Sequence, residues 1–213
     1  MNVLAIVQAR MGSTRLPGKV LKKVNGKPLI EILLYRLSLS KKIDEIIMAT
    51  SKSKENDLLS ETVEKLGFAV FRGSEEDVLD RYYQAAKSYS PEAVVRITGD
   101  CPLIDAKLID AVIQKYQQIG ADYASNTMPP TFPDGLDLSV FSFNTLKVAW
   151  EEATSKYNRE HVTPFMRSND KFKRTNLSNK EDFSTEHWTV DQPKDFEVIS
   201  KIIEHFSPNL NFT

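Results

Sequence analysis

The sequence has 213 residues and a mass of 24.2 kDa, which suits one domain with a sizeable core. A formal net charge of −1 and an isoelectric point near 6.3 exclude a generally basic nucleic-acid-binding surface. Cys101 is the only cysteine, which excludes a disulfide framework and a cysteine-based zinc site and predicts a reducing compartment. The sequence shows no signal-peptide pattern and no apolar run long enough to span a membrane. We therefore expect a soluble cytoplasmic protein that binds neither nucleic acid nor membranes.

Strand and helix patterns alternate along the first 126 residues. Continuous apolar runs such as "NVLAIVQA" predict strands buried on both faces of a sheet, at residues 2–9, 44–51, 68–73, 93–100 and 121–126. Apolar residues at helical spacing predict helices between them, at residues 27–40, 56–67, 77–89 and 105–120. Asp105 is the expected N-cap of the last helix, and Gly120 is expected just beyond its end. This alternation predicts an α/β fold with a mostly parallel central sheet.

The alternation breaks near Thr127, where a segment rich in Pro, Gly and Asp begins. Beyond it we predict strands at 138–143, 172–177 and 186–190, and helices at 144–155, 158–168 and 194–206. We interpret residues 1–213 as a single domain and residues 127–185 as a small excursion subdomain, with the core sheet resuming near Trp188. The apolar segment 138–143 would be an unprotected sheet edge on a monomer, so we expect a homodimer.

A cationic loop follows the first predicted strand, in "AIVQARMGSTRLPGKVL" (residues 5–21). Arg10, Arg15 and Lys19 alternate there with glycines and small hydroxyl residues, including Gly12 and Ser13. Cations this close repel one another unless an anion lies among them, so the loop predicts a phosphate site; a solvated basic loop is the alternative.

The loop is not a P-loop, although "GSTRLPGK" resembles one. Five residues separate Gly12 from Gly18 where the motif has four, and Val20 stands where Ser or Thr would hold magnesium. The remaining interpretation is a loop that binds a polyphosphate through two arginines, a lysine and backbone N–H groups.

Two aspartates are candidate ligands of a divalent metal. Asp100 follows the strand of "RITGDCPLID" and Asp191 follows that of "WTVDQPKD", so we expect both at the sheet edge where the cationic loop lies. Carboxylates are the usual protein ligands of Mg²⁺ in chemistry at phosphorus. The alternatives are a turn residue at Asp100 and a helix cap at Asp191.

Four segments carry a family resemblance: "QARMGSTRLPGKVL", "TGDCPLID", "REHVTPF" and "WTVDQPKDF". In order, and over nearly the whole chain, they resemble the cytidylyltransferases that activate acidic sugars, such as the CMP-Kdo and CMP-sialic acid synthetases. The branch named for spore coat polysaccharide biosynthesis is the most similar. The resemblance implies a Rossmann-like nucleotidyltransferase fold, a homodimer formed through the excursion, and magnesium-dependent transfer of CMP from CTP to an acidic sugar with release of pyrophosphate.

The resemblance also assigns roles to residues. It implies that the triphosphate is bound by Arg10, Ser13, Arg15 and Lys19, with Arg15 and Lys19 stabilising the departing pyrophosphate, and that the metal is bound by Asp100 and Asp191. The nucleotide-reading candidates are Arg72, Gly73 and Arg81, and the acceptor-binding candidates are Asp134, Gly135, Arg159, Glu160 and His161. The branch usually carries a Glu after "GLD" and one apolar residue, where this chain has Ser139, and this difference weakens any transfer of acceptor specificity.

Two other functional classes are compatible with such a sheet. A nucleotide-sugar-dependent glycosyltransferase usually carries a D-x-D metal motif, whereas this chain reads D-C-P at residues 100–102. A non-catalytic nucleotide-binding module predicts loss of the cationic loop or of a metal aspartate, and both are present. The sequence therefore favours the cytidylyltransferase.

Overall fold

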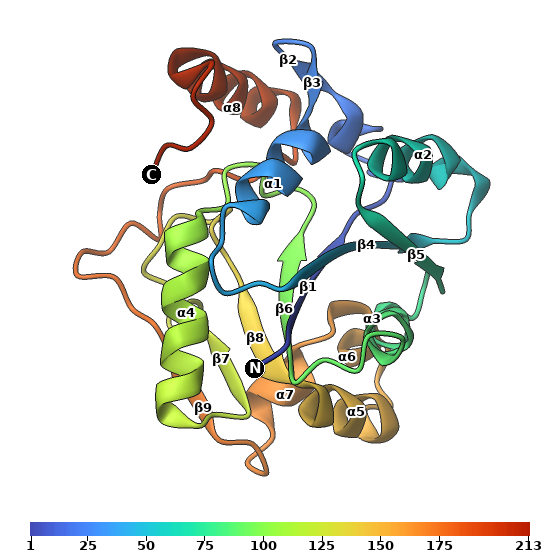
Figure 1. Ribbon diagram of the computed structural model, residues 1–213, viewed down its shortest axis with the longest axis vertical. Helices are drawn as coiled ribbons and strands as arrows, with labels where there is room; N and C mark the ends of the chain where they lie inside the picture. The colour runs from blue at the N-terminus through green and yellow to red at the C-terminus, as the bar shows by residue number, and fades with distance from the viewer.

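A computed structural model describes residues 1–213 (Figure 1). Its strands are β1 (Val3–Gln8), β2 (Lys23–Val24), β3 (Lys27–Pro28), β4 (Glu45–Ser51), β5 (Ala69–Gly73), β6 (Ala93–Thr98), β7 (Tyr123–Ser125), β8 (Ser139–Ser142) and β9 (Arg174–Asn176). Its α-helices are α1 (Leu29–Ser38), α2 (Asp57–Lys65), α3 (Val78–Lys87), α4 (Ala106–Ile119), α5 (Phe143–Glu152), α6 (Lys156–His161), α7 (Pro164–Ser168) and α8 (Pro193–Phe206). Two short 3₁₀ helices are η1 (Lys19–Leu21) and η2 (Lys54–Asn56).

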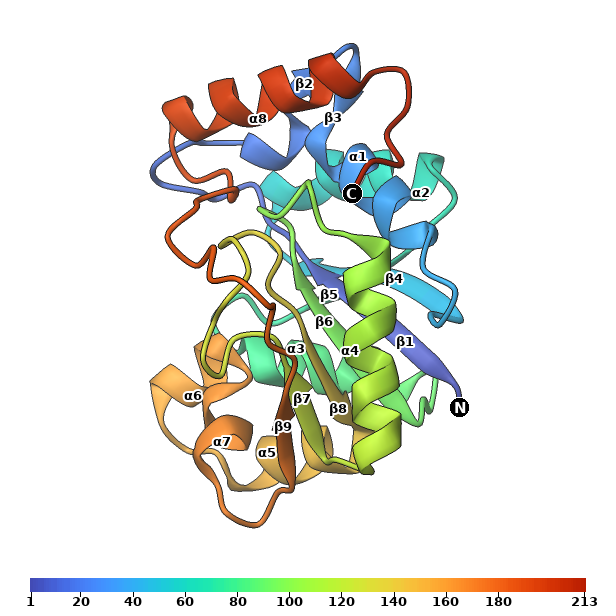
Figure 2. The same cartoon turned by 90° about the vertical axis from the view of Figure 1, so that its left-hand side faces the viewer.

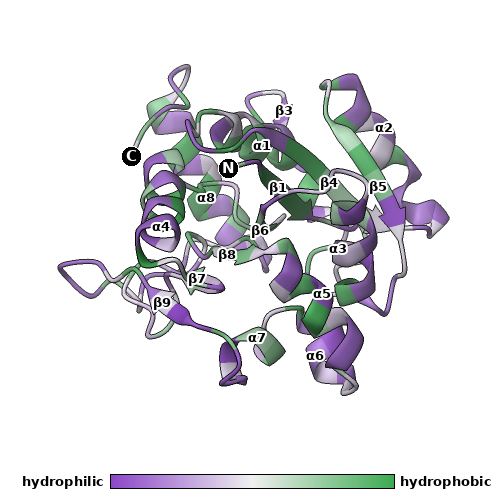
Figure 3. Cartoon of the chain, turned by 60° about the horizontal axis from the view of Figure 1, so that its bottom comes forward, coloured by the Kyte–Doolittle hydropathy of each residue, from purple (hydrophilic) through white to green (hydrophobic).

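The molecule has three layers, with helices on both faces of one central sheet (Figure 2). Side chains alternate along β1: Val3, Ala5 and Val7 pack in the core cluster that includes α1, α2 and α4. Leu4 and Ile6 point the other way, into the cluster that includes α3, α5 and α7. Burial on both faces explains why this strand is a continuous apolar run, and Figure 3 shows such apolar strands between helices with polar outer surfaces.

The seven-stranded sheet has the order β5-β4-β1-β6-β8-β7-β9, and β8 is the one strand that runs against its neighbours. β1 pairs in parallel with β4 on one side and β6 on the other, so the chain order reverses beside β1. The carboxyl ends of β1, β4, β5 and β6 and the amino end of β8 therefore meet at one edge. Ligands of such sheets bind at that edge, near the strand where the order reverses.

The α/β fold with a mostly parallel sheet is confirmed, as are the elements expected over the first 126 residues. The Asp105 side chain accepts a hydrogen bond from Leu108 N at 2.8 Å, as an N-cap does, and Gly120 ends α4 with a left-handed φ of 59°. No helix combines the length and the apolar composition that crossing a membrane requires.

In the second half of the chain, β8, β9, α5 and α8 form where the sequence predicts them, but other features depart from the expectation. The segment assigned to the excursion, residues 127–185, supplies β8 and β9 to the central sheet itself. β8 lies between β6 and β7, and Val140 and Phe141 are fully buried, so the expectation of an exposed strand edge there was wrong. The expected helix 158–168 is two helices separated by Val162, whose φ is 68°.

The strand expected at residues 186–190 is also absent, because that segment follows an irregular loop instead of a neighbouring strand. It is held by two backbone hydrogen bonds to Asp134 and by one from Val190 N to Asp100 O at 2.9 Å. Beyond it, α8 packs in a third core cluster with Leu16 of the cationic loop and Leu29 of α1. Asp191 is thus brought to the same sheet edge without a strand.

Candidate active site

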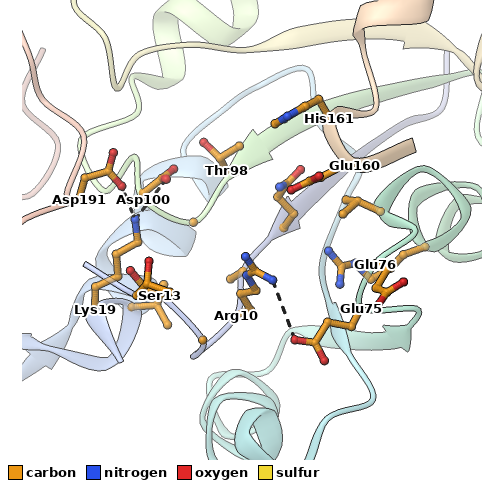
Figure 4. Close-up of a pocket in the computed structure, with 18 of the residues that line it drawn as sticks. Arg10, Ser13, Lys19, Glu75, Glu76, Thr98, Asp100, Glu160, His161 and Asp191 are labelled. Carbon is orange, nitrogen blue, oxygen red and sulfur yellow. Dashed lines mark hydrogen bonds and ion pairs between the residues drawn. The ribbon is translucent and has the colours of Figure 1, made fainter. Parts of the chain in front are cut away.

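Loops that follow β1, β5 and β6 line a cavity of about 650 Å³ at the carboxyl edge of the sheet (Figure 4). The sequence-predicted residues that line it are Arg10, Gly12, Ser13, Arg15, Lys19, Arg81, Asp100, Glu160, His161 and Asp191. A Cβ on Gly99 would lie 2.8 Å from Ala9 Cβ, so only glycine lets the end of β6 lie this close to the start of the cationic loop. This close approach places Asp100 beside the loop.

The cationic loop, residues 10–19, is folded around the backbone carbonyl of Met11. Ser13 N and Gly18 N both donate to Met11 O, at 2.8 and 3.1 Å, and Gly18 adopts a left-handed φ of 66°. Met11 N donates to Asn56 Oδ1 at 2.8 Å, which ties the loop to η2. The loop is therefore a shaped structure rather than a solvated charge run.

Four backbone donors of the loop have no acceptor within the chain. The N–H groups of Arg10, Gly12, Thr14 and Arg15 form no hydrogen bond, and all four residues line the cavity. Unpaired backbone N–H groups beside arginine and lysine side chains are the composition of a phosphate-binding site.

The Lys19 ammonium group lies between the two predicted metal ligands (Figure 4). Its Nζ is 2.8 Å from Asp191 Oδ1 and 3.3 Å from Asp100 Oδ2, and Arg15 Nη2 is 2.9 Å from Asp191 Oδ2. Burial by itself raises the pKa of Asp100, but the Lys19 charge and hydrogen bonds outweigh it, and the pKa of Asp100 is lowered overall. Both carboxylates are therefore held close to one cation position.

The two carboxylates fit a Mg²⁺ ion, because a cationic group of the protein already lies between them. Mg²⁺ takes six oxygen ligands, commonly from one or two carboxylates, phosphates and water. No cluster of three or more His, Cys, Asp or Glu side chains offers a complete protein-made site. The donor set thus suits a metal whose remaining ligands come from a bound triphosphate and from water.

Of the three nucleotide-reading candidates, Arg81 alone lines the cavity. It is 3% exposed, its Nη1 donates to Ser74 O at 2.9 Å, and its buried Nε has no partner. Burial lowers the pKa of this guanidinium, which carries its charge at the cavity wall. Gly73 leaves room for the Arg81 side chain, because a Cβ at Gly73 would lie 2.9 Å from Arg81 Cγ.

Arg72 does not line the cavity, so the structure gives its assignment to the nucleotide no support. Its Nη1 pairs with Asp57 at 2.6 Å, while its Nε and Nη2 donate to the carbonyls of Ser51 and Ser53 at 3.2 and 2.8 Å. These contacts use the guanidinium to tie β5 to the end of β4, away from the cavity. Arg72 is a structural residue here.

Only some of the five acceptor candidates line a pocket. Glu160 and His161 of α6 line the first cavity, opposite Lys19 in Figure 4. Arg159 does not: its Nη2 and Nε bind Asp77 at 2.6 and 2.9 Å, and its Nη1 donates to Trp150 O at 2.7 Å, which fixes α6 to the start of α3.

Of the two remaining acceptor candidates, Asp134 lines a pocket and Gly135 does not. Asp134 lines a second pocket, and its carboxylate lies 3.0 Å from His187 Nδ1. Gly135 has a φ of 110°, and a Cβ there would lie 2.6 Å from the carbonyl carbon of Trp188. Gly135 is therefore required for two loop backbones to approach each other, and it lines neither pocket.

The second pocket, of about 250 Å³, adjoins the first and shares Thr98, Asp100 and Asp191 with it. It contains three charged residues that sequence reasoning missed: Arg96, Asp137 and Arg167. Strand periodicity offered one signal, because Arg96 precedes Thr98 by two residues in "AVVRITGD" and so shares its face of the sheet. Burial and the nearby Asp134 raise the pKa of Asp137 to about 6, against the opposing effect of Arg167 and Arg96.

Comparison with known proteins identifies relatives that span most of the chain. It is 44% identical over 209 residues to an uncharacterized protein of Methanocaldococcus jannaschii, a match that covers 97% of this chain and 85% of the relative. It is 36% identical over 211 residues to the spore coat polysaccharide biosynthesis protein SpsF of Bacillus subtilis, covering 95% of this chain and 87% of that protein. A 3-deoxy-manno-octulosonate cytidylyltransferase of Hydrogenovibrio crunogenus is 33% identical over 168 residues, covering 76% and 61%.

Solved structures share the same fold. A cytidylyltransferase from Leptospira borgpetersenii superposes with a TM-score of 0.94 at 35% identity, covering 100% of this chain and 90% of that one. A CMP:2-keto-3-deoxy-manno-octonic acid synthetase complexed with CTP gives a TM-score of 0.75 at 17% identity, covering 96% and 99%. The sequence profile of the cytidylyltransferases matches residues 4–206. With this match and the convergence of the cationic loop and two aspartates on one cavity, the chain belongs to the cytidylyltransferase family of CTP-dependent nucleotidyltransferases.

Proposed function

We propose that this protein transfers CMP from CTP to an acidic sugar or a related acceptor, with Mg²⁺ as cofactor and release of pyrophosphate, in the synthesis of a surface polysaccharide or glycan. One observation carries the proposal: two adjoining pockets, one rich in phosphate-binding groups, share the carboxylates of Asp100 and Asp191. The acceptor class is also that named for the relative from Hydrogenovibrio, and the pathway is that named for the relative from Bacillus.

The residues of the first cavity suit the triphosphate of CTP. Arginine offers a planar fork to phosphate oxygens and lysine a point charge, and both are available on the cationic loop. In the reaction, an acceptor oxygen forms a bond to the α-phosphorus, the bond from that phosphorus to the bridging oxygen breaks, and the acceptor hydroxyl loses its proton to solvent. Arg15 and Lys19 stabilise the negative charge of the departing pyrophosphate.

Asp100 and Asp191 would hold the metal. When bound there, Mg²⁺ supplies positive charge at the reacting phosphate and lowers the pKa of the acceptor hydroxyl. The side chains of Arg10 and Arg81, on the same cavity wall, hold the nucleotide in register with the two carboxylates. The family membership favours this transfer over glycosyl transfer from a nucleotide sugar.

Ligand-induced stabilisation tests nucleotide binding, because a ligand that binds only the folded protein raises its melting temperature. We expect millimolar CTP with Mg²⁺ to raise the melting temperature more than ATP or GTP at equal concentration. Pyrophosphate release with CTP and a panel of acidic sugars then tests the reaction. Equal shifts with every nucleotide, or no shift with CTP, would contradict the proposed CTP site.

A further inference from the structure

The second pocket holds two arginines whose charges no ion pair neutralises. Arg96 donates no side-chain hydrogen bond, and its buried Nε has no partner. Arg167 donates one hydrogen bond, from Nη2 to the backbone carbonyl of Thr127 at 3.2 Å. The arginines that do form ion pairs within 4.0 Å are Arg10, Arg15, Arg72, Arg159 and Arg174.

The acidic residues of this pocket have other partners or lie apart from both guanidiniums. Asp134 is paired with His187 at 3.0 Å, and Asp100 and Asp191 are paired with Lys19. Asp137 influences both arginines through its charge but forms no ion pair with either. The pocket therefore presents two guanidiniums that are free to bind an anion.

Ser139 keeps Arg96 accessible. The two residues are direct partners in the antiparallel pairing of β6 with β8, so their side chains lie on the same face of the sheet, and both line the pocket. The Ser139 side chain is short, and its hydroxyl is hydrogen-bonded to Tyr123 Oη at 2.7 Å. A glutamate at this position would reach the opposite guanidinium and neutralise it.

We infer that Arg96 and Arg167 form an oxyanion subsite that binds the carboxylate or phosphate of the acceptor, kept open by Ser139. This inference rests on the proposed function, because it names the part of the acceptor that the second pocket recognises. Guanidinium groups bind oxyanions through paired, charge-assisted hydrogen bonds. A buried donor that only the correct ligand satisfies also rejects neutral analogues strongly.

The subsite is tested first by anion binding, with inorganic sulfate and pyruvate as probes. Each is titrated by calorimetry into protein saturated with CTP and Mg²⁺, so that the first cavity is occupied. The variants are Arg96→Met, Arg167→Met and Ser139→Glu. Lys147→Met is the control, because Lys147 is a surface cation 3.8 Å from Glu151 and lies outside both pockets. Arg167 is on the surface, so its variant tests the inference even if Ser139→Glu fails to fold.

We expect saturable binding of at least one probe to the wild-type protein, weakened about tenfold or more in the three pocket variants and unchanged in Lys147→Met. Tighter binding of pyruvate identifies a carboxylate ligand, and tighter binding of sulfate identifies a phosphate. The inference is wrong if the wild-type protein binds neither probe saturably. It is also wrong if Arg96→Met and Arg167→Met bind both probes as well as the control does.

A kinetic arm separates this inference from the proposed function. With Kdo as a carboxylate acceptor and glycerol 3-phosphate as a phosphate acceptor, Arg96→Met should raise the KM of the acceptor at least tenfold and leave the KM of CTP unchanged. If the anion site is present but no acidic acceptor releases pyrophosphate from CTP, the proposed function fails and the subsite stands. If acceptors react and the arginine variants leave their KM unchanged, the subsite fails and the function stands.

Discussion

Lys19 occupies the position that a divalent cation would need, with its Nζ 2.8 Å from Asp191 and 3.3 Å from Asp100. A metal bound by both carboxylates must displace this ammonium group, which then needs new oxygen partners. In the proposed function, the triphosphate of CTP would supply them, because Lys19 belongs to the cationic loop that lines the same cavity. Metal and nucleotide should therefore strengthen each other's binding, and free metal should bind weakly.

Replacement of Lys19 tests this competition. Lys19→Met should raise the affinity for Mn²⁺ in the absence of CTP by about tenfold, because the internal cation that opposes the metal is gone. Electron paramagnetic resonance of free and bound Mn²⁺ measures this directly, with the exposed Lys23→Met as control. Equal Mn²⁺ affinities in the two variants would show that Lys19 does not compete with the metal.

Substitution of the two aspartates, Asp100 and Asp191, distinguishes a metal-dependent enzyme from a protein that only binds a nucleotide. Asp100→Asn and Asp191→Asn should each fold normally, because asparagine keeps the shape of the side chain. Each should slow pyrophosphate release by roughly 10²- to 10³-fold, the range found when transition-state electrostatics are removed. Nucleotide affinity should fall less than rate, and the double variant should be little worse than either single one, because both residues act through one metal.

Circular dichroism supplies the control for folding in these variants. An aspartate whose asparagine variant keeps most of its activity at saturating magnesium is a turn or cap residue. If both variants keep it, the metal-dependent chemistry proposed for this site is wrong.

Asp137 should make the stability of the protein depend on pH. Its pKa is about 6 in the folded protein and about 3.9 in an unfolded chain, so the folded state binds more protons between these values. Stability should therefore fall as pH rises from about 4 to about 6, and then remain lower. Asp137→Asn should stabilise the protein by about 1–2 kcal/mol at pH 7 and by almost nothing at pH 4.

Urea unfolding at pH 4 and pH 7 measures this difference. Asp170→Asn is the matched control, because the Asp170 side chain is 96% exposed. If Asp137→Asn raises the free energy of unfolding at pH 7 by no more than Asp170→Asn does, Asp137 titrates as an ordinary surface carboxylate.

At the scale of elements, Asp191 depends on contact between two irregular loops. Trp188 N donates to Asp134 O at 2.6 Å, and Asp134 N donates to Glu186 O at 3.0 Å. Gly135 lets the two backbones approach, and Val190 N then binds Asp100 O at 2.9 Å. The position of one metal candidate is thus set by a glycine more than fifty residues away in the sequence.

A methyl group at this glycine should disrupt the contact. Gly135→Ala should lower the free energy of unfolding by on the order of 2–4 kcal/mol, because it combines a positive φ with a clash against the backbone of Trp188. Gly26→Ala is the control, since Gly26 has a φ of 80° but no atom within 4 Å of its Cβ position, and it should cost about 1 kcal/mol. If urea unfolding gives the same loss of free energy of unfolding for Gly135→Ala and Gly26→Ala, the close approach of the two backbones does not contribute to stability.

Local patterns predicted the elements whose signals are local. The apolar run of β1 and the capping residues of α4 are of this kind, as is the charge of the loop after β1. The position of β8 was not predictable in this way, because strand order depends on contacts between distant segments. The ion pairs of Arg72 and Arg159 were not predictable for a similar reason, because their partners Asp57 and Asp77 come near only in the folded chain.

At the scale of the whole molecule, the exposed-edge argument for a dimer no longer applies. The edges of the sheet are β5 and the three-residue β9, whereas β8 is covered on both sides. The homodimer remains a prediction from the family resemblance alone. Multi-angle light scattering should give about twice the mass of one chain at micromolar concentration, and a mass near 24 kDa would contradict it.

The reversed direction of β8 has a consequence for how this architecture diversifies. In a fully parallel sheet, each site loop follows its strand; here the segment that precedes β8, residues 134–138, also reaches the reacting edge. It contributes to the second pocket alone, while the cationic loop contributes to the first alone. Substitutions in this short segment, and at Ser139 beside it, should therefore change the shape of the second pocket and leave the cationic loop of the first unchanged.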